Sequence, residues 1–157
     1  MLQRKQSLFL LLAGLLAFST WLFPVAEYES ASGLHTLRTY GLFTADGAEV
    51  NEVALRIPFG VLLSVIGAGA LACILLYGNR PRQMRFIRGT YLLMLAVIAF
   101  LFITDNSVQS YLAQGGGAEG HYGLSFYIPL VVIVLLFLAE RAVKADEALV
   151  RSMDRLR

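Results

Sequence analysis

Four long runs of apolar residues, separated by shorter polar segments, dominate the pattern of the chain. They cover residues 7–25, 57–77, 89–104 and 125–141. A helix that crosses the roughly 30 Å hydrocarbon core of a bilayer needs about 20 mostly apolar residues, and these runs are close to that length. The third run is the shortest, and we expect its helix to continue out of the membrane to residue 113. The pattern therefore predicts an all-α integral membrane protein, in which residues 1–157 form a single domain with a four-transmembrane-helix bundle.

A cleaved signal peptide is the alternative interpretation of the first run, because the basic residues Arg4 and Lys5 precede it. The far end of this run carries Trp21, Phe23 and Pro24. Aromatic residues at such a position are typical of a membrane interface rather than of a cleavage site. We therefore expect the first run to be retained as a transmembrane helix.

The polar segment after the first run, residues 27–56, carries the pattern of a small outer β-hairpin. Two stretches that contain β-branched and aromatic residues flank the dipeptide Asp46-Gly47. Asp-Gly in this position is a strong signal of a two-residue hairpin turn. A turn that closes on this pair would place Phe43 opposite Val50. An irregular loop is the alternative.

Small side chains recur along the second run, at or near every fourth residue. They are Gly60, Ser64, Gly67, Ala68 and Ala72. Helices in lipid gain little from hydrophobicity when they associate, and they gain most from the close packing that small residues allow. We therefore predict that this stripe is the helix-packing seam within the chain, and a dimer interface is the alternative.

Charged residues make up only 15% of the chain and are concentrated between and beside the apolar runs. A basic turn between the second and third runs contains Arg80, Arg82, Arg85 and Arg88 and no acidic residue. Basic residues collect on the cytoplasmic side of membrane proteins, so we expect this turn and both termini to be cytoplasmic. These arginines lie beside predicted spans without interleaved aromatic residues, which favours anionic lipid head groups over nucleic acid as their partner.

The two remaining polar segments follow the third and fourth runs. Residues 114–124 are rich in glycine and are predicted to form an outer loop, and residues 142–157 form a charged cytoplasmic tail. Helical spacing places Leu149, Met153 and Leu156 on one face of that tail. We predict that the tail is helical and that this apolar face contacts a membrane-protein partner. The alternative is a solvated tail whose basic residues only enforce the topology.

Residues that carry chemistry are scarce. The interiors of the apolar runs contain no Asp, Glu, Lys, Arg or His, and Asp105 at the end of the third run comes closest. His35 and His121 lie in outer segments without the spacing of metal ligands, and Cys73 is the single cysteine. Catalysis and transport across a membrane commonly use ionisable groups within the spans. We therefore predict no catalytic, cofactor or metal site, and no enzyme activity.

Two terminal stretches, MLQRKQSLFLLLAGLLA and KADEALVRSMDRLR, resemble a bacterial family of small four-span membrane proteins known from the Bacteroidetes group. That family is described only as a domain of unknown function. The resemblance implies an inner-membrane location and a four-helix fold, and it supplies no activity and no catalytic residues. We expect a non-enzymatic inner-membrane protein, an accessory or scaffold subunit of a larger membrane assembly. The alternative is a small homo-oligomeric transporter or channel with Asp105 near its mouth.

Overall fold

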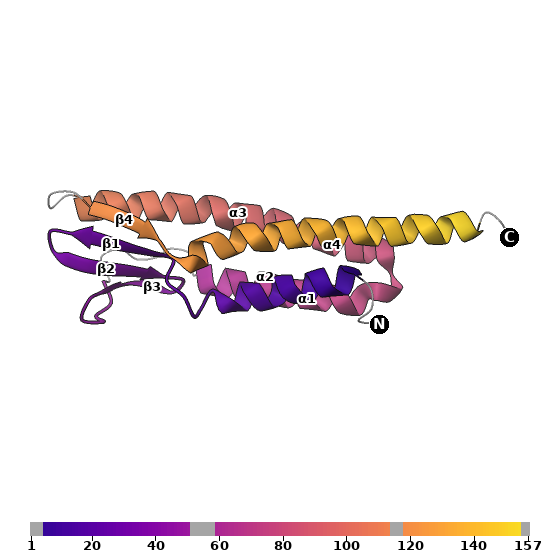
Figure 1. Cartoon of the computed structure of the whole chain (residues 1–157), viewed down its shortest axis with the longest axis horizontal. Coiled ribbons are helices and arrows are strands. Elements are labelled where there is room, and N and C mark those ends of the chain that lie inside the picture. The colour runs from indigo at the N-terminus through magenta and orange to yellow at the C-terminus, as the bar shows by residue number, and fades with distance from the viewer. Residues whose placement is uncertain (1–4, 51–58, 114–117, 155–157) are drawn as a thin grey trace.

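The computed structural model describes residues 5–50, 59–113 and 118–154 as a long, narrow molecule with helices along its length and a sheet at one end (Figure 1). The helices of these residues are α1 (Lys5–Ser19), α2 (Phe59–Leu75), α3 (Arg80–Ala113) and α4 (Leu124–Asp154), and a short 3-10 turn, η1 (Leu76–Gly78), follows α2. α1 and α3 each pack against both α2 and α4. The four helices therefore surround one apolar core.

Each helix buries one face against the others. The buried side chains of α3 follow the spacing of a single helix face. They are Gln83, Ile87, Met94, Val97, Leu101, Asp105, Val108 and Leu112. Large apolar side chains on the other faces of α3 are exposed, among them Leu92, Leu95, Phe100, Phe102 and Ile103. An apolar exterior around an apolar core is what helices in contact with lipid require.

Three helical segments in the described part of the chain are long and apolar enough to cross a membrane. They are Phe59–Gly78, Arg80–Ala113 and Leu124–Val150. α1 is also apolar, but it has only 15 residues, which corresponds to about 22 Å at 1.5 Å per residue. α1 is therefore the short member of the group.

The prediction of an all-α protein with a small hairpin is wrong, because the described residues also form a four-stranded antiparallel sheet (Figure 1). The strands are β1 (Ala26–Ser30), β2 (Gly33–Arg38), β3 (Gly41–Thr44) and β4 (Ala118–Tyr122), in the spatial order β3-β2-β1-β4. β4 comes from the glycine-rich segment that the sequence predicts to be a loop. It is a strand because β1, far away in the sequence, satisfies its backbone hydrogen bonds.

The chain reverses at Asp46-Gly47 as predicted, but the register is shifted by one residue. Phe43 pairs with Glu49 rather than with Val50. The shift arises because the turn has three residues between Thr44 and Ala48, with Gly47 at φ +78°, instead of two. A left-handed glycine closing a three-residue loop is the usual alternative to the two-residue turn. The partner stretch continues into residues 51–53, which lie outside the described residues.

The predicted basic turn is mostly helix. α3 already begins at Arg80, so the connection after η1 is reduced to Asn79. The Asn79 side chain accepts a hydrogen bond from the backbone N–H of Arg82 at 3.3 Å, which caps the new helix. Pro81 stands in the first turn, where its missing N–H costs nothing. The arginines therefore lie on the first turns of a rigid helix rather than on a loop.

Glycines allow α1 and α2 to approach closely. A Cβ atom on Gly67 would lie 3.2 Å from the backbone oxygen of Gly14 and 3.1 Å from the ring of Phe18. A Cβ atom on Gly60 would lie 2.7 Å from the indole of Trp21. That indole N–H donates a hydrogen bond to Ser64 Oγ at 2.9 Å. The predicted stripe is thus divided by the structure, because Gly67 faces α1 and Gly60 and Ser64 face Trp21 just after its end.

The other two residues of the predicted stripe, Ala68 and Ala72, are exposed in the single chain. Gly67 contacts α1, whereas the adjacent Ala68 is exposed, so substitutions at these two positions provide a matched test.

We predict that Gly67→Leu lowers the free energy of unfolding by about 1–3 kcal/mol, because the added side chain overpacks the α1–α2 contact. Ala68→Leu, at the next position but exposed, should leave it nearly unchanged. Thermal unfolding of both purified variants in detergent measures the difference. Equal melting temperatures would show that the close approach of α1 and α2 does not contribute to stability.

Candidate interaction site

Polar contacts gather at the two ends of the helices. At the sheet end, the carboxylate of Asp105 on α3 is only 5% exposed. It accepts hydrogen bonds from the phenol of Tyr28 on β1 at 2.5 Å and from the phenol of Tyr122 on β4 at 3.1 Å. The amide of Gln109, one turn further along α3, donates a third bond at 3.3 Å. One carboxylate therefore joins two neighbouring strands to α3.

The sheet is shaped to let Tyr28 reach α3. Residues of β1 alternate between buried and exposed, so that Ala26 and Tyr28 point inward. Gly120 pairs with Tyr28 on β4, and a Cβ atom there would lie 3.0 Å from the phenol ring. A side chain at this position would crowd the phenol ring, and glycine leaves room for it.

The two phenols are held in their protonated, hydrogen-donating form. Burial raises the pKa of Tyr28 above its ordinary value, and the hydrogen bond to Asp105 and the charge of that carboxylate raise this pKa further. The hydrogen bond to Asp105 raises the pKa of Tyr122, with a smaller effect from burial. Because the carboxylate has donors on both oxygens, the arrangement is suited to fixing the sheet in place.

At the opposite end, the Glu140 side chain on α4 is almost fully buried and lies between two cations. Its Oε1 atom is 2.7 Å from Arg88 Nε on α3 and 2.8 Å from Lys144 Nζ one turn along α4. The sequence indicates the Lys144 pair by its i,i+4 spacing. It does not indicate Arg88, because 52 residues separate it from Glu140.

Two buried glutamines lie near this end. Gln83 Nε2 donates to the backbone oxygen of Cys73 at 2.9 Å, which ties the start of α3 to the end of α2. Gln6 on α1 is 2% exposed. The Oε1 atoms of both glutamines are buried without a hydrogen-bond partner in the described part of the chain. An unsatisfied buried acceptor is unusual in a folded protein and requires a reason.

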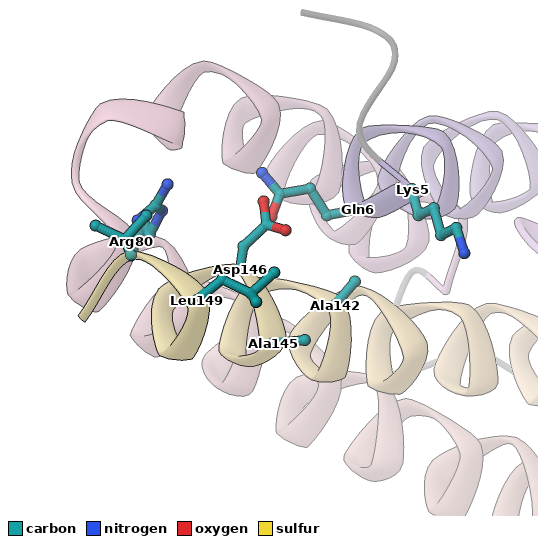
Figure 2. Close-up of a pocket in the computed structure, with 8 residues that line it drawn as sticks. Lys5, Gln6, Arg80, Ala142, Ala145, Asp146 and Leu149 are labelled. Carbon is teal, nitrogen blue, oxygen red and sulfur yellow. The ribbon is translucent and has the colours of Figure 1, made fainter. Parts of the chain in front are cut away.

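Gln6 lines a cavity of about 520 Å³ between α1, the start of α3 and the end of α4 (Figure 2). The lining residues are Lys5, Gln6, Arg80, Ala142, Ala145, Asp146, Leu149 and Val150. Figure 2 shows the Gln6 amide and the Asp146 carboxylate pointing toward one another across this space. The cavity therefore combines two cations, one carboxylate and an apolar wall.

The structure distributes the predicted contact residues over several environments. Arg80 lines the cavity, Arg88 binds Glu140, and Arg82 and Arg85 are exposed. Leu149 lies at the edge of the cavity and is 65% exposed. The Met153 side chain and Leu156 lie outside what the structure describes.

Sequence reasoning did not identify Gln6, Tyr28, Tyr122 or Glu140 as site residues. A polar Gln6 at the start of an apolar run was the only local signal for the cavity. Tyr28 and Tyr122 offered none, because their shared partner is distant in sequence.

These features define a class: a helical membrane protein with a small antiparallel sheet at one end of its helices. Within the described residues no group of three or more His, Cys, Asp or Glu could hold a metal ion. Residues 2–156 match the model of the family described as Domain of unknown function (DUF4293), so the chain belongs to that family. A comparison with curated proteins gave no match.

The raised pKa values of the two tyrosines predict sensitivity to alkaline pH. Each phenol has a higher pKa in the folded than in the unfolded protein, where the pKa is about 10. The stabilisation is therefore complete below pH of about 10 and is lost as the pH rises above it. We expect Tyr28→Phe to lower the free energy of unfolding by about 1–3 kcal/mol at neutral pH, because Asp105 loses a donor.

Thermal unfolding in detergent as a function of pH checks this prediction. The loss of stability above pH of about 10 should be shallower in Tyr28→Phe than in the parent. Tyr127→Phe, at a half-exposed position, is the matched control and should follow the parent. Parallel pH profiles of the parent and Tyr28→Phe would contradict the role assigned to the Asp105 contact.

Proposed function

We propose that the chain is a non-enzymatic accessory or scaffold subunit of a larger inner-membrane assembly, and that it contacts its partner through the end of α4. The observation that carries this proposal is the projection of α4 beyond the other three helices (Figure 1). α4 runs without interruption from Leu124 to Asp154. Its last turns therefore form a protruding surface that the other described residues do not cover.

The continuity of α4 gives this surface its rigidity. A helix of about a dozen residues is marginal by itself in water, because its first turn is costly to form. The end of α4 avoids that cost because it extends a helix whose Val132, Leu136 and Val143 are fully buried. Leu149 near the end of α4 is a large apolar side chain with 65% of its surface exposed. A rigid helix with an exposed apolar side chain suits docking in a groove of another protein.

We also propose that all four helices cross the membrane, with both termini cytoplasmic. Three helices are long and apolar enough by themselves, and α1 packs between α2 and α4. Exposed Trp21, Leu22 and Phe23 extend the apolar length of α1 toward the sheet. The positive-inside bias supports the orientation, because Arg80, Arg82, Arg85, Arg88 and Lys144 all lie at the end away from the sheet.

The burial of Asp105 favours this proposal over a channel with Asp105 at its mouth. Three side chains of the chain itself already donate to that carboxylate. A carboxylate occupied in this way is a structural anchor, and an ion that used it would have to displace those donors.

The topology is tested by cysteine labelling of intact cells in a Cys73→Ser background. We expect a membrane-impermeant reagent to label Ala45→Cys, in the exposed turn after β3, without opening the cells. Ala148→Cys, on the exposed end of α4, should react only after the cells are opened. Labelling of Ala148→Cys from outside would contradict the orientation.

The docking role of α4 is tested by replacing Leu149, Met153 and Leu156 together by Ser while every charge is kept. We expect the variant to insert in normal amounts and to lose the proteins that co-purify with the parent from native membranes. Ala148→Ser, also on an exposed face of α4, is the control and should retain them. If the triple variant keeps the same proteins at the same ratio, the end of α4 is not the docking surface.

A further inference from the structure

The cavity between α1, α3 and α4 has the chemistry of a lipid head-group site. We propose that it binds a phospholipid whose head group carries a primary ammonium, as phosphatidylethanolamine does. This inference rests on the proposed membrane orientation, which brings the cavity to the cytoplasmic head groups, but it requires no protein partner.

The buried amide of Gln6 is the first observation. Its Oε1 atom has no hydrogen-bond donor among the described residues, although Gln6 is 2% exposed. Leaving a buried acceptor unsatisfied costs free energy, so a donor from outside the chain would be stabilised there. The amide lines the cavity, which gives such a donor a place to bind.

The position of Asp146 indicates what kind of donor fits. Its carboxylate and the Gln6 amide point toward one another in the cavity (Figure 2). Asp146 already has an interaction partner, and because a carboxylate accepts about four hydrogen bonds it has the capacity for a further one. A primary ammonium carries one positive charge and three N–H donors, and it can therefore bond to both side chains at once.

Basic groups for the phosphate lie on either side of these acceptors. Figure 2 shows Lys5 and Arg80 flanking the Gln6–Asp146 pair. Arg80 is the first residue of the long helix α3, and Lys5 lies in the first described turn of α1. Helix N-termini favour anions because their first N–H groups are unpaired and the helix dipole is positive there. The cavity thus matches a zwitterion, with acceptors at the centre and cations at the flanks.

The opposite wall favours a lipid over a soluble phosphate ester. Ala142, Leu149 and Val150 supply apolar surface from α4. The cavity lies next to Leu10 and Val143, where the fully buried apolar residues of α1 and α4 end. A phospholipid has its glycerol and acyl chains at the same boundary, whereas a free phosphate ester would leave this wall unused.

The test compares three phospholipids with identical acyl chains on the purified full-length chain in detergent, by native mass spectrometry. Phosphatidylcholine has the same charges but no N–H donor, and phosphatidylglycerol has no ammonium. We expect phosphatidylethanolamine to bind about tenfold or more tightly than phosphatidylcholine, because a site built around a hydrogen bond rejects the analogue that lacks the donor.

Two substitutions assign the preference to the cavity. Gln6→Leu and Asp146→Asn should each bring phosphatidylethanolamine down to the level of phosphatidylcholine. Gln6→Glu keeps an acceptor and should retain the preference. Glu147→Gln removes the next acid along α4, which does not line this cavity, and it should bind as the parent does. Melting temperatures without added lipid verify that each variant is folded.

Equal binding of phosphatidylethanolamine and phosphatidylcholine by the parent would overturn the proposal, since it would mean that the Gln6 amide donates to Asp146 and needs no ligand. A preference for phosphatidylglycerol would overturn it in favour of a purely anionic site. Soluble phosphoethanolamine that competes as well as the lipid would show that the ligand is a free phosphate ester. Because no other protein is present, these results are independent of whether α4 docks a partner.

Discussion

The hydrogen bonds to Asp105 hold the two parts of the molecule together. A four-stranded sheet of short strands has little core of its own, and it must pack against a helix to be stable. Tyr28 and Tyr122 bring β1 and β4 to one carboxylate on α3, and Gly120 leaves the space that Tyr28 needs. Charge-assisted hydrogen bonds of this kind are stronger than those between neutral groups. The orientation of the sheet relative to the helices therefore depends on one buried acid.

The helices themselves are arranged by close packing in the middle and polar contacts at the ends. Apolar side chains do not distinguish a neighbouring helix from lipid, so hydrophobicity alone would leave the helices free to slide. Gly14 and Gly67 bring α1 and α2 together. At the basic end, Arg88 and Glu140 connect α3 to α4. These directional contacts set the register that apolar burial leaves open.

The same arrangement explains why both proposed interactions lie at the basic end. The sheet end is closed by its own hydrogen bonds, and its central acid is already occupied. At the basic end, α4 extends beyond the other helices. Leu149 is exposed there, and a cavity lies beside Gln6. A partner helix and a lipid head group would use adjacent surfaces there, and these surfaces share Leu149, which lines the cavity and is also exposed near the end of α4.

The sequence by itself determined the apolar helices and the position of the basic residues, because apolar runs and charge clusters are local patterns, but it did not determine where α3 begins. It located the reversal at Asp46-Gly47 but not its register. It also identified Gly60 and Gly67 as packing residues, but it did not identify the segment against which they pack. Only the tertiary structure decided the sheet, since β4 is a strand through its pairing with β1. The same holds for Asp105, whose partner Tyr28 is 77 residues away. Contacts between distant segments leave no periodicity in the chain, and they appear only when folding brings those segments together.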